Sequence, residues 1–162
     1  MADAKVLVVM GSDSDFPVME GCFKMLNKFG VGFKATVASA HRTPDKAMSL
    51  ARNAENEGFK VIIAAAGLAA HLGGVLAANT ALPVIGVPCK GGALAGVDAL
   101  YATVQMPTGI PVATVAVNSA ANAALLAAEI LAVSDRTLAA KLDEKRRQDA
   151  EKVLEKDRKL NS

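Results

Sequence analysis

The sequence predicts a doubly wound α/β domain, a parallel sheet with helices on both faces, and three observations support that class. Five short apolar runs, KVLVVM, FKATVA, KVIIAAA, PVIGVP and VATVAV, are rich in β-branched residues and lack a steady period of two. Strands that are buried on both faces of a parallel sheet have this pattern. Segments with helical periodicity alternate with the runs. The length of 162 residues suits one domain with a sizeable core.

The elements follow one another in regular alternation along the chain. The five runs occupy residues 5–10, 33–38, 60–66, 83–88 and 112–117, and we expect each to form a strand of the sheet. Helices are predicted over 16–29, 44–57, 71–80, 93–105 and 120–134. No repeat or domain boundary interrupts this order. We therefore expect residues 1–162 to form a single three-layer α/β/α domain of the flavodoxin-like type.

The C-terminal tail, 135–160, is predicted to be one long, highly charged helix. Its sequence, DRTLAAKLDEKRRQDAEKVLEKDRKL, carries a thin apolar stripe of Leu138, Leu142, Val153 and Leu154. Two interpretations stay open: an amphipathic helix that caps its own domain, or an arm that reaches a neighbouring subunit. The alanine-rich segment NAALLAAEIL also favours association, because small, flat helix faces suit symmetric packing between copies.

Composition excludes several classes of protein. The net charge is +2 and charges of both signs are mixed along the chain, so there is no basic stretch of the kind that binds nucleic acid. Two cysteines do not make a disulfide framework, and the N-terminus lacks the features of a signal peptide, so a cytoplasmic location is expected. Residues 61–89 carry no charge, but glycines and prolines break them into pieces too short to cross a membrane.

The loop after the first strand, MGSDSDF, is a candidate anion site. Ligands of open α/β sheets bind beyond the carboxyl ends of the strands. Gly11 allows a tight turn, while Ser12, Ser14 and Asp15 offer hydroxyls, a carboxylate and free amides at a helix N-terminus, where phosphate binds well. The loop is neither a Walker loop nor a GxGxxG fingerprint. The plainer interpretation is helix capping by Ser14 or Asp15.

The loop after the second strand, SAHRTPDK, holds a histidine and an arginine. Thr43 can cap a helix with Pro44 at its first position, so His41 and Arg42 lie on the loop before it. Arg42 could complete the anion site, and His41 could move a proton because imidazole titrates near neutral pH. The alternative for His41 is an ordinary surface histidine.

Two further loops are rich in small residues. AAGLAAHLGG brings its backbone close to the cleft, with Gly67 permitting unusual dihedral angles. Its histidine, His71, could be a ligand, a second acid/base or a helix cap. PCKGGALAGVDALY adds a glycine-rich turn with Lys90. The two histidines lie on separate loops, and the sequence has neither HExxH nor CxxC, which argues against a metal site. It also lacks GxSxG, the nucleophile motif of Ser-His-Asp hydrolases.

Taken together, six segments resemble one family across nearly the whole chain: MGSDSD, SAHRTPD, AGLAAHLGG, VIGVP, GVDALYATVQMPTGIPVATVAV and NAALLAAEIL. They are similar, in order and spacing, to the aminoimidazole ribonucleotide carboxylase family in its bacterial-type mutase class. The resemblance implies interconversion of 5-(carboxyamino)imidazole ribonucleotide and 4-carboxy-5-aminoimidazole ribonucleotide in purine biosynthesis. It also implies that no metal or cofactor is used and that the chain forms a homo-octamer.

The resemblance also implies roles for individual residues. Ser12 and Arg42 would hold the phosphate of the ribonucleotide and Asp15 its ribose hydroxyls. His41 would be the acid/base, and His71 would lie near the migrating carboxylate. Small side chains would leave room for the ring, and the remaining expected substrate-binding positions are Gly11, Ser14, Ser39, Ala40, Gly67, Ala70 and Leu72.

The chain departs from the family pattern at three positions. The family usually reads GGAAHLPG, whereas this chain has Leu68 in place of a glycine and Gly73 in place of the proline, and Phe16 replaces a common tryptophan. Two other functions remain possible on the sequence. One is a carboxylase of the same family that uses free carbon dioxide, and the other is a flavodoxin-like nucleotide-binding module without turnover.

Overall fold

The computed structural model describes residues 4–161 and confirms the predicted class. Five parallel strands pair in the order β2-β1-β3-β4-β5. Their bounds are β1 (Val6–Met10), β2 (Phe33–Val37), β3 (Val61–Gly67), β4 (Val84–Cys89) and β5 (Ala113–Thr114). The order reverses between β1 and β3, since β1 pairs with β2 on one side and β3 on the other. Doubly wound folds bind their ligands at the carboxyl end of this switch point.

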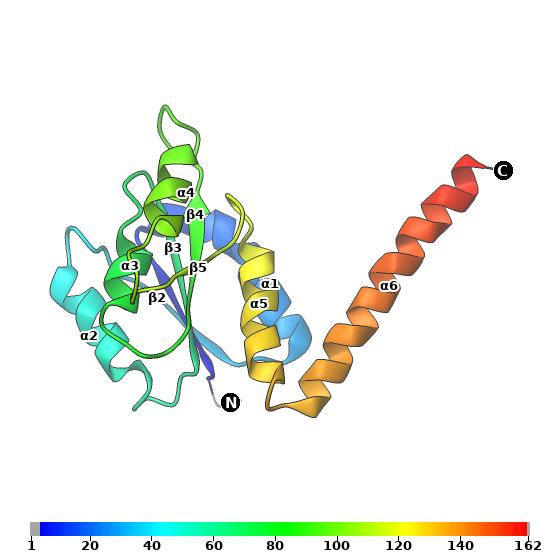
Figure 1. Ribbon diagram of the computed structural model, residues 1–162, viewed down its shortest axis with the longest axis horizontal. Helices are drawn as coiled ribbons and strands as arrows, with labels where there is room; N and C mark the ends of the chain where they lie inside the picture. The colour runs from blue at the N-terminus through cyan, green and yellow to red at the C-terminus, as the bar shows by residue number, and fades with distance from the viewer. Residues whose placement is uncertain (1–3, 162) are drawn as a thin grey trace.

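Helices cover both faces of the sheet, as Figure 1 shows. On one face α1 (Phe16–Phe29) lies beside α5 (Ala120–Ala132), and α2 (Pro44–Ala54), α3 (Leu72–Ala77) and α4 (Val97–Val104) lie on the other. The short 3-10 turn η1 (Asp13–Asp15) precedes α1. Several elements are shorter than the sequence predicted. These are the helices α2, α3 and α4, and β5, which keeps only two residues of its run. Glycines with positive φ at Gly92 and Gly96 delay α4 to Val97.

Burial along the strands corrects one expectation. β1 and β4 are buried throughout and β3 over its first five residues, but β2 is half exposed. β2 is an edge strand that pairs only with β1 among the described residues. Its apolar run was therefore wrong as a prediction of a strand buried on both faces. The long, fully buried side chains come from the central strands and from α1 and α3, including Leu7, Ile62, Ile63, Met19 and Leu76.

The alanine-rich face of α5 does not provide the expected surface for a second copy. Its buried residues belong to the core on the α1 side of the sheet: Ala120, Ala123, Ala124, Ala127 and Ala128. Small side chains let the α5 backbone approach α1 and the sheet closely. The expectation that this face packs between subunits was wrong, because the chain buries it internally.

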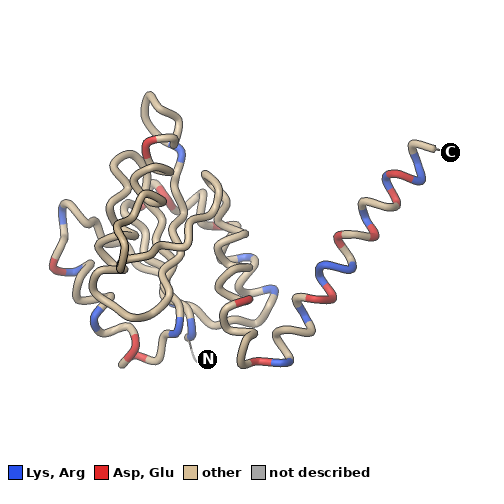
Figure 2. The backbone as a smooth tube through the Cα atoms, in the orientation of Figure 1, with Lys and Arg blue, Asp and Glu red and all other residues tan. Residues whose placement is uncertain are grey.

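The C-terminal helix α6 (Arg136–Leu160) divides into two parts. Near its start the Asp135 side chain accepts a hydrogen bond from the backbone N–H of Leu138, and Leu138 and Leu142 are buried in the core. Farther along, the helix extends away from the domain, with charges of both signs alternating along it (Figures 1 and 2). Val153 and Leu154 are exposed there. Within residues 4–161, no helix is long and apolar enough to cross a bilayer.

Candidate active site

The loops that follow β1, β2, β3 and β4 enclose a cleft of about 600 Å³ at the carboxyl ends of the strands. The lining includes every site residue predicted from the sequence except Ala70. Ala70 is 2% exposed and is not part of this lining, so its predicted role in substrate binding stays a prediction. The cleft therefore brings together four loops that lie far apart in the chain, from Gly11 after β1 to Gly92 after β4.

The loop after β1 is held by a reciprocal pair of hydrogen bonds. The backbone N–H of Ser14 donates to Ser12 Oγ over 3.3 Å, and the backbone N–H of Ser12 donates to Asp15 Oδ2 over 3.0 Å. This is a capping box centred on Ser12, so capping by Ser14 or Asp15, the alternative from the sequence, is not what forms. Asp15 is buried at the cleft floor, and that burial raises the pKa of its carboxyl despite the hydrogen bond from Ser12.

The loop after β2 is closed by Ser39 and Thr43. Thr43 Oγ1 accepts from the backbone N–H of Ser39 over 2.9 Å and donates to the Ser39 carbonyl over 3.2 Å. Thr43 occupies the N-cap position of α2 but makes no side-chain cap, because its hydroxyl is already used in this turn. The Ser39 hydroxyl in turn accepts from the backbone N–H of Arg42 over 3.1 Å. The turn presents His41 and Arg42, both exposed, at the mouth of the cleft.

The two histidines of the chain meet in the cleft. His41 Nε2 lies 2.9 Å from His71 Nδ1, and the rings are nearly perpendicular, at 80° with centroids 4.9 Å apart. One nitrogen of this pair must donate and the other accept, so two protonated rings would oppose their N–H groups. His71 makes no side-chain cap to α3, which rules out the capping interpretation.

The loop after β4 supplies lining that sequence reasoning did not include among the binding residues. It adds Lys90, Gly91 and Gly92, and the last residue of β4 adds Cys89. Val18 of α1 and Ala66, Leu68 and Ala69 of β3 and its loop also line the cleft. Lys90, Gly91 and Gly92 follow directly after a predicted strand, so their position in the sequence could have indicated them. Cys89 and Val18 could not be found in this way, because Cys89 belongs to a buried strand and Val18 lies on a helix.

Cys89 is a neutral thiol rather than a nucleophile. Burial raises the pKa of its side chain to about 12, and the nearby Asp15 carboxylate adds to the shift. The thiolate is the reactive form, so nucleophilic chemistry at Cys89 is strongly disfavoured at neutral pH. The other cysteine, Cys22, is fully buried, and burial raises its pKa to about 12 as well.

We expect the native protein to resist alkylation at both cysteines. At pH 8 a thiol with a pKa near 12 has about 10³-fold less thiolate than an ordinary cysteine. Iodoacetamide labelling followed by mass spectrometry of the intact protein checks this, with urea-unfolded protein as the positive control. Rapid labelling of Cys89 in the folded state would contradict the buried, neutral thiol.

Two departures from the family pattern have clear structural positions. Gly73 lies in the first turn of α3 and is buried, where an added Cβ would make an ordinary contact with Val112 Cγ1 at 3.5 Å. Leu68 has a left-handed backbone with φ of 54° and a side chain that is 54% exposed. Gly73 is thus part of a helix rather than of the loop around His71, whereas Leu68 lies at the cleft itself.

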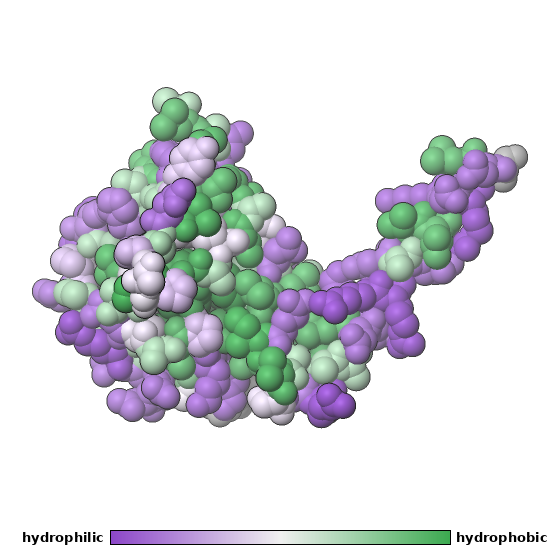
Figure 3. All heavy atoms as spheres, in the orientation of Figure 1, coloured by the Kyte–Doolittle hydropathy of each residue, from purple (hydrophilic) through white to green (hydrophobic). Residues whose placement is uncertain are grey.

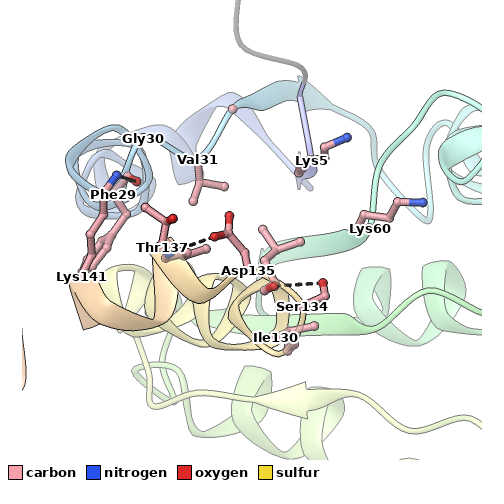
Figure 4. A pocket seen from close by; sticks show the side chains of 13 residues that line it. Lys5, Phe29, Gly30, Val31, Lys60, Ile130, Ser134, Asp135, Thr137 and Lys141 are labelled. Atoms are coloured by element: carbon pink, nitrogen blue, oxygen red, sulfur yellow. Dashed lines mark hydrogen bonds between the residues drawn. The ribbon is translucent and has the colours of Figure 1, made fainter. Parts of the chain in front are cut away.

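A second pocket, of about 460 Å³, lies at the opposite end of the strands and is shown in Figure 4. It opens where α5 and α6 meet the domain, and Lys141 Nζ there donates to the Phe29 carbonyl over 3.2 Å. It contains no histidine or cysteine. In residues 4–161 no three His, Cys, Asp or Glu side chains gather in a way that could hold a metal ion.

Comparison with known proteins gives one consistent family. Residues 5–152 match the family described as AIR carboxylase. The chain is 51% identical over 156 residues to an N5-carboxyaminoimidazole ribonucleotide mutase of Thermotoga maritima, a match covering 96% of this chain and 91% of that protein. It is also 51% identical to the mutase of the same name from Escherichia coli K12, covering 94% and 91%.

Two other relatives show how the same domain occurs elsewhere. A phosphoribosylaminoimidazole carboxylase of Saccharomyces cerevisiae is 50% identical over the whole chain, but the chain spans only 28% of that longer protein. The crystal structure of Treponema denticola PurE superposes with a TM-score of 0.89 at 31% identity, covering 98% of this chain and 99% of that one. Sequence and fold therefore point to the same group of proteins.

Proposed function

The chain belongs to the AIR carboxylase family, and from that membership we propose that it is an isomerase of purine biosynthesis. It converts N5-carboxyaminoimidazole ribonucleotide into 4-carboxy-5-aminoimidazole ribonucleotide, in keeping with relatives that are named N5-carboxyaminoimidazole ribonucleotide mutases. The observation that carries this proposal is the His41–His71 pair, joined over 2.9 Å inside the cleft at the switch point of the sheet. Imidazole can act as an acid and as a base near neutral pH. It therefore suits a reaction that protonates one atom of the substrate and deprotonates another.

The polar ends of the cleft suit a ribonucleotide. Ser12 and Arg42 lie on neighbouring loops after β1 and β2, and together they offer a hydroxyl and a guanidinium to a phosphate. The Asp15 carboxylate at the floor can accept hydrogen bonds from ribose hydroxyls. Ser39 and Ala40 are small and half-buried, so they leave space for a flat imidazole ring between the phosphate site and the histidines.

In the proposed mechanism His41 gives one proton to the substrate and later receives another from it. His41 donates a proton to the exocyclic nitrogen, the N–C bond of the carbamate breaks, and its electron pair remains on that nitrogen as carbon dioxide leaves. A π-electron pair of the ring then forms the new bond from ring carbon to carbon dioxide. The C–H proton at that carbon returns to His41, which restores the aromatic ring. Electrons and protons balance within the substrate and one imidazole, so the mechanism needs no metal or cofactor.

His71 has a supporting part in this proposal. Its Nδ1 faces His41 Nε2, so the hydrogen bond fixes the orientation of the His41 ring and determines which of its nitrogens is free. The small residues Ala66, Gly67 and Ala69 line the cleft beside it. This backbone-rich wall can approach the migrating carboxylate closely and exclude water from it.

A direct assay with freshly prepared carbamate substrate tests the function. We expect conversion to the carboxylated ribonucleotide without added bicarbonate, and the same rate when EDTA is present. A flavin-binding or nucleotide-sensing protein of this fold would show no conversion. Activity that EDTA abolishes and zinc or magnesium restores would overturn the metal-independent mechanism, while an absence of conversion would overturn the function itself.

We also propose that the chain is cytoplasmic and forms a homo-octamer, as the family resemblance implies. Exposed apolar side chains support association: Leu94, Val97, Tyr101 and Val104 lie on and before α4, and Figure 3 shows apolar surface there and on the outer part of α6. Exposed ion pairs such as Arg158 with Glu151 lie along outer α6, and pairs of this kind contribute little to stability. A surface on a second copy would bury Val153 and Leu154, which favours the interpretation of α6 as an arm.

Substitution of Val153 and Leu154 by serine is expected to lower the oligomeric mass in light scattering. The change leaves Leu138 and Leu142 in place, so the base of α6 keeps its packing on the domain. Replacing the exposed Lys156 by serine is the matched control on the same helix and should leave the mass unchanged. An unaltered mass in the double variant would exclude α6 as the arm, and a monomeric wild-type chain would exclude the octamer.

A further inference from the structure

The backbone of Leu68 adopts a conformation that leucine disfavours. Its φ of 54° lies in the left-handed region, and only Ala95 and Asn118 share this among the described residues other than glycine. An L side chain there crowds the following carbonyl oxygen, which is why glycine usually occupies such positions. Strain of this kind persists when the surroundings fix it, and it concentrates at functional sites. Leu68 lies directly at the end of β3, on the cleft.

The side chain of Leu68 bridges two loops across the cleft. Its Cδ2 lies where Gly92 has no side chain: a Cβ added at Gly92 would come within 2.6 Å of that atom. A Cβ at the preceding Gly91 would lie 3.9 Å from it. The leucine that replaces a small residue after β3 is thus accommodated by a glycine after β4.

Lys90, the residue before the two glycines that Leu68 approaches, is held by hydrogen bonds around it. The backbone N–H of Lys90 donates to Asn118 Oδ1 over 2.7 Å, and the backbone N–H of Asn118 donates to the Pro88 carbonyl over 2.9 Å. A Cβ at Gly96 would lie only 3.1 Å from Lys90 Cα, so the chain also packs closely there. The glycines that Leu68 approaches therefore follow directly on a residue that is held in place.

Leu68 also differs chemically from the rest of the cleft. Of the large apolar side chains that line it, Leu72 is buried and Val18 is half-buried, whereas Leu68 is 54% exposed. The polar groups of the lining, among them His41, His71 and Lys90, can bind a carboxylate but cannot hold neutral carbon dioxide by charge. An apolar side chain at the mouth can delay its escape and keep water out.

We propose that Leu68 is a latch that closes the cleft between the β3 and β4 loops and retains the carbon dioxide freed from the substrate. This inference rests on the proposed mutase function. The bonds involved are those already described: the N–C bond of the carbamate breaks, free carbon dioxide exists briefly, and the ring carbon captures it. The latch takes no part in these steps, and it changes the fraction of carbon dioxide that escapes between them.

The test measures how much carbon label the product keeps when labelled carbamate reacts in excess unlabelled bicarbonate. Leu68→Gly removes the side chain and relieves the strain, and Leu68→Asn keeps a left-handed backbone accessible but offers a polar side chain. For both we expect about a tenfold rise in unlabelled product, the size of effect that loss of apolar contacts in a pocket produces. Affinity for the product ribonucleotide should not change.

Leu94→Ala is the matched control, because Leu94 is an exposed leucine on the β4 loop that does not line the cleft. It should keep the label as the wild type does. Full retention in both Leu68 variants, or equal leakage in the Leu94 variant, would overturn the latch while leaving the mutase function intact. Wild-type protein that fails to convert the carbamate would instead remove the proposed function and the latch with it. Circular dichroism confirms folding, and the asparagine variant decides if the glycine variant unfolds.

Discussion

Alanine at position 41 is expected to reduce turnover by about 10²–10⁴-fold, the usual contribution of a positioned acid/base. The loss should fall near the upper end because one imidazole serves both the protonation of nitrogen and the deprotonation of carbon. Ribonucleotide binding should remain, since Ser12, Asp15 and Arg42 are unchanged. Stability should also remain, because His41 is exposed and its ring bonds to His71, which is exposed as well.

Steady-state kinetics on the purified variant, together with product binding by calorimetry, measures both expectations. His71→Asn is the informative companion: it removes the ring that orients His41 but leaves His41 itself, so its loss of turnover should be smaller. Near-normal turnover in folded His41→Ala protein would remove His41 from the mechanism. A larger effect at position 71 than at 41 would reverse the two roles.

Arg42→Ala is expected to weaken substrate binding by about 10- to 100-fold, because a hydrogen bond to a charged group contributes about 1.5–3 kcal/mol. The phosphate contact is the same in the ground state and in the transition state, so KM should rise while kcat changes little. Arg42→Lys keeps the charge but loses the planar fork, and it should give an intermediate KM. A variant with unchanged KM and a large fall in kcat would place Arg42 at the reacting end instead.

Most of the fold could be predicted from the sequence because burial dominates the pattern of its central strands. The runs at 5–10, 60–66 and 83–88 are apolar since both faces of these strands lie under helices, and the long helix α1 was predicted to the residue. The short elements were not predicted as well. β5 keeps two residues of an apolar run, and α4 begins late, because positive φ at Ala95 and Gly96 sets the chain direction before it. Such local geometry leaves no periodic signal.

The candidate site was predicted loop by loop, but its internal contacts were not. Any parallel sheet brings together the loops after its strands, so the residues of the cleft could be listed in advance. The bond between His41 and His71 joins positions 30 apart and depends on the register of β1, β2 and β3. The capping box of Ser12 and the turn of Ser39 with Thr43 likewise depend on hydroxyl orientation. Spacing alone could not distinguish these from ordinary helix caps.

The fate of the carboxylate carbon in the wild-type protein tests the central claim most directly. Labelled carbamate is incubated with the protein in excess unlabelled bicarbonate, and the label in the product is measured by mass spectrometry. If the released carbon dioxide is recaptured in the closed cleft before it diffuses away, the product keeps most of its label. Product whose label is diluted to the level of the bicarbonate pool would show that the protein takes up free carbon dioxide as a carboxylase, and it would contradict the mutase mechanism.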